Sequence, residues 1–94
     1  MGKISMKAIL TVIGEDKVGI IAGVSNKLQE FNINILDVNQ TIMQGFFTMM
    51  MVLDCKNMNT QFEDVHKALN AKGIELGVEV KIQREEIFKS MHSL

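Results

Sequence analysis

Few side chains in this 94-residue sequence could catalyse a reaction or hold a metal ion. The single cysteine, Cys55, supplies at most one thiolate, and the two histidines, His66 and His92, fall on two different predicted helices. A zinc site needs three or four ligands that converge, and nucleophilic catalysis needs a base beside the nucleophile. Because neither arrangement is evident, we expect these three residues to be structural, and we predict no metal, no cofactor and no enzymatic activity.

The chemistry that remains is binding, and one stretch suggests where it occurs. Residues 13–20 join an apolar strand pattern to a helical pattern, and Gly14 and Gly19 flank a Glu-Asp-Lys triplet within them. The first N–H groups of a helix have no partner within the helix and carry partial positive charge, so they can hold a carboxylate or a phosphate. This junction therefore predicts a site that binds a small anionic group.

Composition limits the function classes further. Ten Lys and Arg residues against eleven Asp and Glu residues give a net charge of −1, which argues against a nucleic-acid binder. No apolar run approaches the ~20 residues that span a bilayer, and a lone cysteine suits a reducing cytoplasm. The hydrophobic fraction of 47% exceeds the need of one small core, so we expect a homo-oligomer interface.

The hydrophobic pattern predicts the element order β-α-β-β-α-β. Strands are expected over residues 6–13, 33–43, 46–53 and 74–83, with a bulge near Asp37 and a turn at Gln44 and Gly45. The first helix is expected from Lys17 or Val18 to Phe31. The second follows a Thr-x-x-Glu capping box at residues 60–63 and runs to about Lys72, where Gly73 stops it. A further amphipathic helix is expected over residues 84–94.

This order predicts an α+β, ferredoxin-like βαββαβ sandwich. Two right-handed crossovers joined by a hairpin give a four-stranded antiparallel sheet of order 4-1-3-2 with both helices on one face. The strands at 6–13 and 46–53 are apolar on both faces, as central strands should be. Their second face needs a cover, from the C-terminal helix or from a second subunit. We expect residues 6–83 to form one domain and residues 84–94 to belong to the same unit.

Three other functions known on this layout do not fit the residues. A soft-metal chaperone would need paired cysteines in the first loop, and a phosphatase of the acylphosphatase type would need an arginine there. The only arginine is Arg84, at the far end of the chain. An RNA-binding sheet would need a basic stripe beside Phe46 and Phe47, and the sequence has none.

Two segments together resemble a known family. Residues 16–20 (Asp-Lys-Val-Gly-Ile) and, one helix later, residues 32–35 (Asn-Ile-Asn-Ile) resemble the ACT domain, an amino-acid-sensing regulatory module. The resemblance covers residues 6–83. The Gln-Thr pair at 40–41 and the Phe-Thr-Met run at 47–49, with the C-terminal helix, are similar to the small free-standing ACT proteins of prokaryotes.

The resemblance implies a ligand site and a partner. ACT domains pair side by side through their sheets or back to back, and they bind small amino acids at the interface between subunits. Carried over by position, Gly14, Asp16, Gly19 and Ile20 would form the ligand loop, and Asn34 would face the ligand from the other side. Backbone N–H groups near Gly19 would take the carboxylate, and Asp16 and Asn34 the ammonium. The alternative is structural: Asp16 caps the helix and Asn34 permits a tight turn.

Two functions follow from these expectations. The first is a cytoplasmic, homodimeric, non-catalytic module that binds an amino acid and regulates a partner protein. The second is an interaction dimer without a ligand, which docks on an enzyme or a transcription regulator. Ligand binding distinguishes the two functions.

Overall fold

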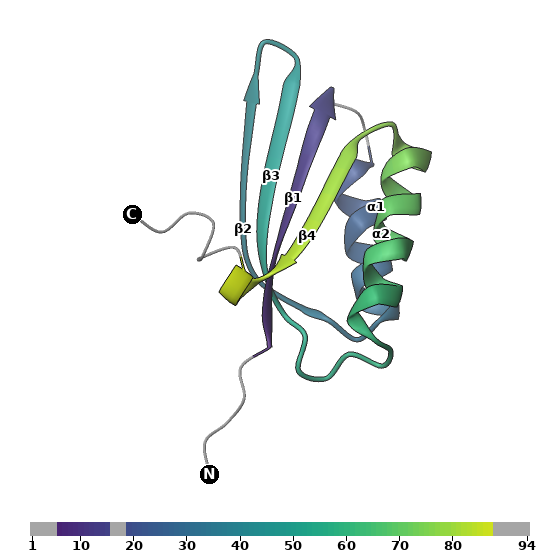
Figure 1. The fold of residues 1–94 in the computed structure, drawn as a ribbon. Coiled ribbons are helices and arrows are strands. Elements are labelled where there is room, and N and C mark those ends of the chain that lie inside the picture. Colours follow the sequence, from purple (N-terminus) through teal and green to yellow (C-terminus); the bar gives the residue numbers. More distant parts are fainter. Residues whose placement is uncertain (1–5, 16–18, 88–94) are drawn as a thin grey trace.

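The computed structural model describes residues 6–15 and 19–87. The elements are β1 (Lys7–Glu15), α1 (Ile20–Glu30), β2 (Asn34–Met43), β3 (Phe46–Asp54), α2 (Phe62–Leu76) and β4 (Glu79–Arg84). The strands form one antiparallel sheet of order β2-β3-β1-β4, and both helices lie on one of its faces (Figure 1). The predicted ferredoxin-like α+β fold and its strand order are confirmed.

The core lies between the helices and the two central strands. Alternate residues of β1 and β3 point to the helices and are fully buried, which is the period-2 pattern of a strand packed on one side. The helices contribute residues spaced three to four apart, which share one helical face. The main members of this core are Leu10, Val12, Ile20, Val24, Leu28, Met49, Met51, Leu53, Val65 and Leu69.

The predicted boundary between the second helix and the fourth strand was wrong. The helix α2 continues past Gly73 to Leu76, and β4 begins at Glu79. Position 73 requires glycine because α2 packs closely on the strand side there. A Cβ atom at this position would lie 2.7 Å from Cγ2 of Val80 and 3.0 Å from the carbonyl oxygen of Val78. The helix ends at Gly77, whose φ of 75° is left-handed and whose N–H donates to the carbonyl of Ile74.

The predicted capping box at residues 60–63 was also wrong. α2 begins at Phe62, and its N-cap residue Gln61 makes no side-chain cap hydrogen bond. The Thr60 hydroxyl instead donates to Oδ2 of Asp64 at 2.8 Å, so the helix starts later in the chain than a cap at Thr60 would give. The first helix, α1, begins at Ile20 with Gly19 as its N-cap, and the predicted start at Lys17 or Val18 lies outside the described residues.

The hairpin of β2 and β3 has the two predicted irregularities. The register between the strands shifts between Ile35 and Asp37, which confirms the bulge near Asp37. Gln44 and Gly45 form the turn with φ values of 50° and 85°, and two positive φ values in a row are typical of a two-residue hairpin that matches strand twist. The bulge therefore sets which side chains of β2 share each face.

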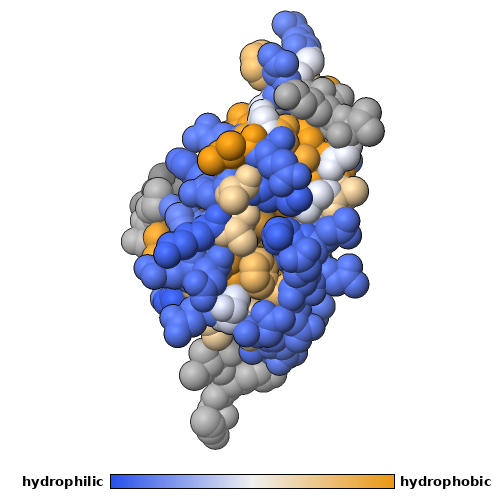
Figure 2. Space-filling view, turned by 90° about the vertical axis from the view of Figure 1, so that its right-hand side faces the viewer, coloured by the Kyte–Doolittle hydropathy of each residue, from blue (hydrophilic) through white to orange (hydrophobic). Residues whose placement is uncertain are grey.

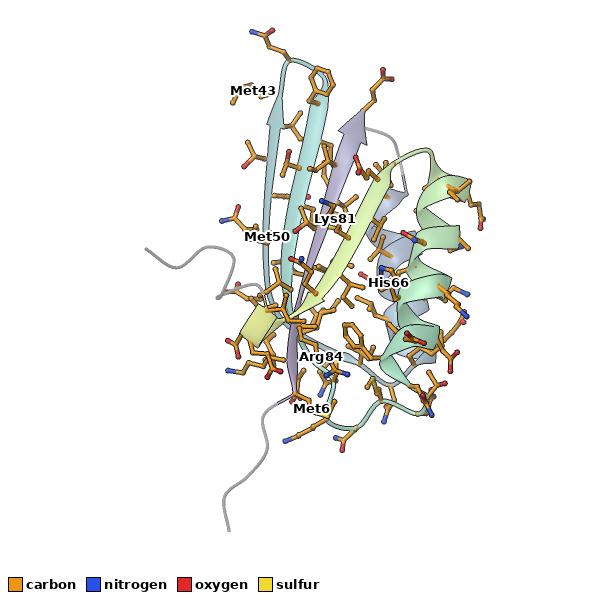
Figure 3. The ribbon with its side chains drawn as sticks, in the orientation of Figure 1. Met6, Met43, Met50, His66, Lys81 and Arg84 are labelled. Carbon is orange, nitrogen blue, oxygen red and sulfur yellow. The ribbon has the colours of Figure 1, made fainter. Side chains whose placement is uncertain are left out.

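Large surfaces of the sheet remain exposed in a single chain. Every residue of β2 is exposed, because the helices pack over the other strands. On the face away from the helices, Met43 and Met50 also lie open (Figure 3). The helix side is largely hydrophilic, with hydrophobic residues in smaller patches (Figure 2). Residues 85–87 form one helical turn, and the rest of the predicted C-terminal helix lies outside the described residues, as does His92. Among the described residues no helix has the length and apolar character that a membrane span requires.

Candidate functional site

A hollow of about 500 Å³ opens at the N-terminus of α1. It lies between the first turn of α1 and the neighbouring ends of β2 and β3. Its floor is buried, while Ile21 and Ile42 at its mouth are 40% and 57% exposed. Gln40 is the polar side chain among the residues that line it, and none of them is charged. The lining residues are Gly19, Ile20, Ile21, Ala22, Gln40, Ile42 and Phe47.

The start of α1 supplies backbone N–H groups as hydrogen-bond donors to this hollow. Gly19, the N-cap residue, has a φ of 90° and no side-chain cap. The first helical hydrogen bond runs from the N–H of Gly23 to the carbonyl of Gly19 at 2.9 Å, so the N–H groups of the residues before Gly23 have no acceptor within the helix. An uncapped helix start beside apolar walls can accept a carboxylate attached to an apolar group.

The structure brings together only part of the predicted ligand set. Gly19 and Ile20 line the hollow. Gly14 does not line it, and a Cβ atom at Gly14 would lie 2.8 Å from Cγ1 of Val78, so this glycine permits close packing of the segment before β4. Asp16 lies outside the described residues.

Asn34 lies at the opposite end of the sheet. It pairs with Asp54, which in turn pairs with Lys7, whereas Gly14 pairs with Phe47 near the other end of β1. At about 3.3 Å per residue, Asn34 and the hollow in one chain are roughly 20 Å apart. Asn34 could meet a ligand in the hollow only from a second copy of the chain.

The pattern of the sequence contained a signal for the residues that were missed. Gln40 and Ile42 alternate on β2, and Ile42 pairs directly with Phe47 across the hairpin. A short hairpin next to the first helix places these side chains on the helix side of the sheet. The sequence marked Gln40 only through the family resemblance and Ile42 only as a strand residue, because the face of β2 that they share depends on the bulge.

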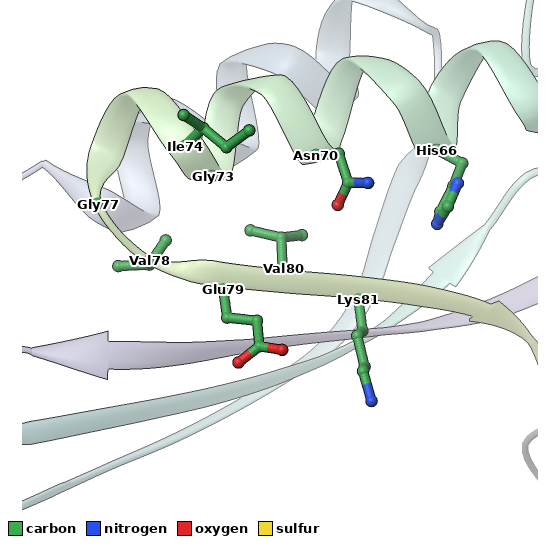
Figure 4. Close-up of a pocket in the computed structure, with 9 residues that line it drawn as sticks. All are labelled: His66, Asn70, Gly73, Ile74, Gly77, Val78, Glu79, Val80 and Lys81. Carbon is green, nitrogen blue, oxygen red and sulfur yellow. The ribbon is translucent and has the colours of Figure 1, made fainter.

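A second groove, of about 570 Å³, lies between α2 and the edge strand β4 (Figure 4). His66, Asn70 and Ile74 line it from α2, at a spacing of four residues, and Val78 and the β4 residues Glu79 to Lys81 line it from the other side. His66 is exposed on the flank of α2, the helix on which the sequence placed it. Within the described part of the chain no three His, Cys, Asp or Glu residues are grouped closely enough to hold a metal ion.

The Cys55 thiol is buried and only 1% exposed. Burial, with a smaller effect of the Asp54 carboxylate, raises its pKa from 9.0 to about 11. Because the thiolate is the reactive form, a lower thiolate fraction makes the thiol inert at neutral pH. The structural role expected for Cys55 agrees with this environment.

We expect native Cys55 to react with iodoacetamide at neutral pH about a hundredfold more slowly than in urea-unfolded protein, since two pKa units reduce the thiolate a hundredfold. Mass spectrometry of timed samples measures both rates, and Cys55→Ser is the blank. The same shift favours the folded state below pH 9, and that contribution is lost as the pH rises toward 11. Equal rates in both states would contradict the buried, protonated thiol.

Comparisons with known proteins agree with this architecture. Residues 7–83 match the family model described as ACT domain. A UPF0237 protein of Listeria innocua is 61% identical over 89 residues, which cover 95% of this chain and 100% of the relative. The solved ACT domain protein from Streptococcus pneumoniae is 42% identical with a TM-score of 0.79, over 92% of this chain and 97% of that one. The regulatory subunit of aspartate kinase from Thermus thermophilus, at 22% identity, shares the fold with a TM-score of 0.65, over 85% of this chain and 52% of that one.

Proposed function

The chain belongs to the ACT-domain family, and on that premise we propose that it is a non-catalytic regulatory module that binds an amino acid between two copies of itself. The module would work in the cytoplasm on a partner protein. The bound amino acid would favour one arrangement of the two copies over another, and a partner that recognises this arrangement would respond.

The observation that carries this proposal is the hollow at the start of α1. An amino acid is a zwitterion with a side chain, so it needs donors for the carboxylate, an acceptor for the ammonium and a surface for the rest. The uncapped N–H groups of α1 are the donors, and Oε1 of Gln40 is an acceptor on the facing strand. Ile21 and Ile42 offer an apolar surface for the ligand side chain.

The exposure of β2 supports the proposed dimer. A fully exposed strand with an unpaired edge and the apolar residues Ile35, Val38 and Ile42 on one face is a template for strand pairing. Suppose that β2 pairs antiparallel with β2 of a second copy over its full length. Because both strands carry the bulge, side chains on the same face of the sheet stay opposite each other, and the two-fold axis passes through Asn39. Ile35 of the partner subunit would then lie opposite Ile42 at the edge of the hollow. Asn34 of the partner subunit would lie opposite Met43 on the other face of the sheet, so this pairing does not bring the predicted Asn34 contact to the ligand.

A thermal-melting screen of the purified protein against the twenty amino acids tests the proposal. A ligand that binds only the native state at about ten times its Kd adds about 1.4 kcal/mol to the free energy of unfolding, which raises the Tm by roughly 5–10 °C. One amino acid, or one chemical class of amino acids, should stand out. A flat screen on a confirmed dimer would favour the alternative, an interaction dimer that binds no ligand.

Ala22→Glu separates loss of the site from loss of the fold. Ala22 is exposed and lies in the first turn of α1, where a carboxylate stabilises the helix through its dipole. The variant should melt at or slightly above the wild-type temperature without ligand, yet lose the ligand-induced rise because its carboxylate occupies the anion position. Ala22→Gln, of equal size and without charge, should keep most of that rise. An unchanged rise in Ala22→Glu would move the site elsewhere.

A further inference from the structure

The edge strand β4 lacks most of the features that keep sheet edges apart. Within the described sheet β4 has one neighbour, β1, and the register between them runs without a bulge. The sequence contains no proline that could block the edge. Natural proteins protect open edges with prolines, bulges or charges that repel a second strand. β4 has charges, so their arrangement decides whether the edge repels or attracts a copy of itself.

The groove beside this edge leaves a large apolar side chain in solvent. Ile74, on α2, is 82% exposed, and it follows Gly73, which packs against Val80 near the middle of the groove (Figure 4). An isoleucine with so much exposed area beside an open strand edge gains most from a partner that covers both the side chain and the edge. Glu79 and Lys81 also line the groove, and their side chains extend away from α2 (Figure 4).

The charges on β4 are self-complementary in one register. Glu79 and Lys81 lie on the sheet face away from the helices, as their partners Ile13 and Thr11 on β1 do. If a second β4 pairs antiparallel with a two-fold axis at Val80, Glu79 lies opposite Lys81 of the partner subunit, and the reverse pair forms on the other side. Opposite charges directly across strands stabilise pairing, and like charges destabilise it.

We propose that β4 and its groove bind the same edge of a second copy of this chain, in the register centred on Val80. Ile74 side chains of both copies then approach the seam at the same level as this axis. Two other registers keep the side chains of β4 on their faces. An axis at Lys81 places two lysines opposite each other, and an axis at Ile82 places Lys81 opposite Gln83, so only the Val80 axis forms two opposite-charge pairs.

This interface goes beyond the proposed function, because it lies at the sheet edge opposite to β2. A chain with a self-complementary contact at each edge assembles past the dimer, into a row of copies joined alternately through β2 and through β4. The ligand hollow beside α1 stays at the β2 joints. Contacts at β4 would therefore connect dimers to one another without altering the amino-acid site.

The test isolates the β4 edge in a background whose β2 edge is blocked by Val38→Lys. Analytical ultracentrifugation of this background over a range of concentrations should show a monomer–dimer equilibrium. Adding Lys81→Glu places two Glu–Glu pairs across the seam and should weaken the dimer by about tenfold or more. Adding both Glu79→Lys and Lys81→Glu recreates the opposite pairs and should restore the dimer. Lys67→Glu, an equal charge change at an exposed site of α2 outside the groove, should have little effect.

Each result decides the proposal. The Val80 register is supported if Lys81→Glu weakens the dimer and the combined Glu79→Lys and Lys81→Glu substitutions restore it. A Val38→Lys background that stays monomeric at every concentration would overturn the interface, as would equal effects of Lys81→Glu and Lys67→Glu. Hydrogen exchange controls for misfolding, because the amides of β1 and β3 should stay protected in all variants. The β4 amides that point away from β1 should become protected only as the dimer forms. Ligand-induced melting shifts are measured separately, so this proposal and the proposed function can fail independently.

Discussion

The Gly73→Ala substitution should lower the free energy of unfolding by about 1–2 kcal/mol, although alanine is the better helix former by about 1 kcal/mol. The added Cβ atom would lie 2.7 Å from Cγ2 of Val80 and 3.0 Å from the carbonyl oxygen of Val78. The backbone oxygen and the β-branched valine cannot yield without separating α2 from β4. Urea denaturation measures the change, and an unchanged m-value shows that the loss is one of stability.

The matched control is Gly23→Ala, another glycine inside a helix. Its added Cβ atom would lie 3.1 Å from Cδ1 of Leu76, the far end of a flexible side chain that can move by a few tenths of an ångström. This variant should be neutral or more stable by up to about 1 kcal/mol, because only the gain in helix propensity remains. If both glycine variants shifted stability in the same direction by the same amount, the close contact between α2 and β4 would not be the cause.

The Val38→Lys substitution should weaken the dimer through β2 by about tenfold or more. Val38 is 44% exposed in a single chain, so the substitution leaves the fold of the monomer intact. In the proposed pairing it faces Gln40 of the partner subunit, close to the two-fold axis at Asn39. A lysine there removes apolar contact and brings two ammonium groups together across the axis, and a loss of about 1.4 kcal/mol is already tenfold. Sedimentation equilibrium measures the dissociation constant.

The position of the axis has its own test. Asn39 is exposed and would face Asn39 of the partner subunit. Asn39→Asp and Asn39→Lys should each weaken the dimer, because each puts two like charges opposite one another, while an equal mixture of the two variants should dimerise better than either alone. If the mixture behaves as the average of its components, β2 does not pair in this register.

The sequence predicted most of the fold, because its strands and helices follow simple periods. The two-faced strands at residues 6–13 and 46–53 had to be central, and the irregular spacing around Asp37 marked the bulge. The errors concern the ends of the second helix and the start of the fourth strand. Gly73 was interpreted as a helix stop, since glycine commonly ends helices, but its reason is the approach of Val80, a tertiary contact that no local pattern contains.

The candidate site was less predictable than the fold. The glycines of the first loop predicted a site at the start of the first helix, and Gly19 and Ile20 line the hollow there. The opposite wall, with Gln40, Ile42 and Phe47, depends on the register of the hairpin and on which side of the bulge each residue falls. Asn34 lies far from the hollow and on the other face of the sheet, because its face depends on the bulge and on the register with β3, which a local pattern does not contain.

The most direct test of the ligand-binding dimer is its dissociation constant with and without the amino acid that raises the melting temperature. A ligand bound between two copies must tighten their association, since linkage makes the effect of ligand on dimer equal to the effect of dimer on ligand. We predict a dissociation constant at least about tenfold lower at saturating ligand, and no such change in Ala22→Glu. A dissociation constant that ligand leaves unchanged, or the absence of any amino acid that stabilises the protein, would contradict an amino-acid site between subunits.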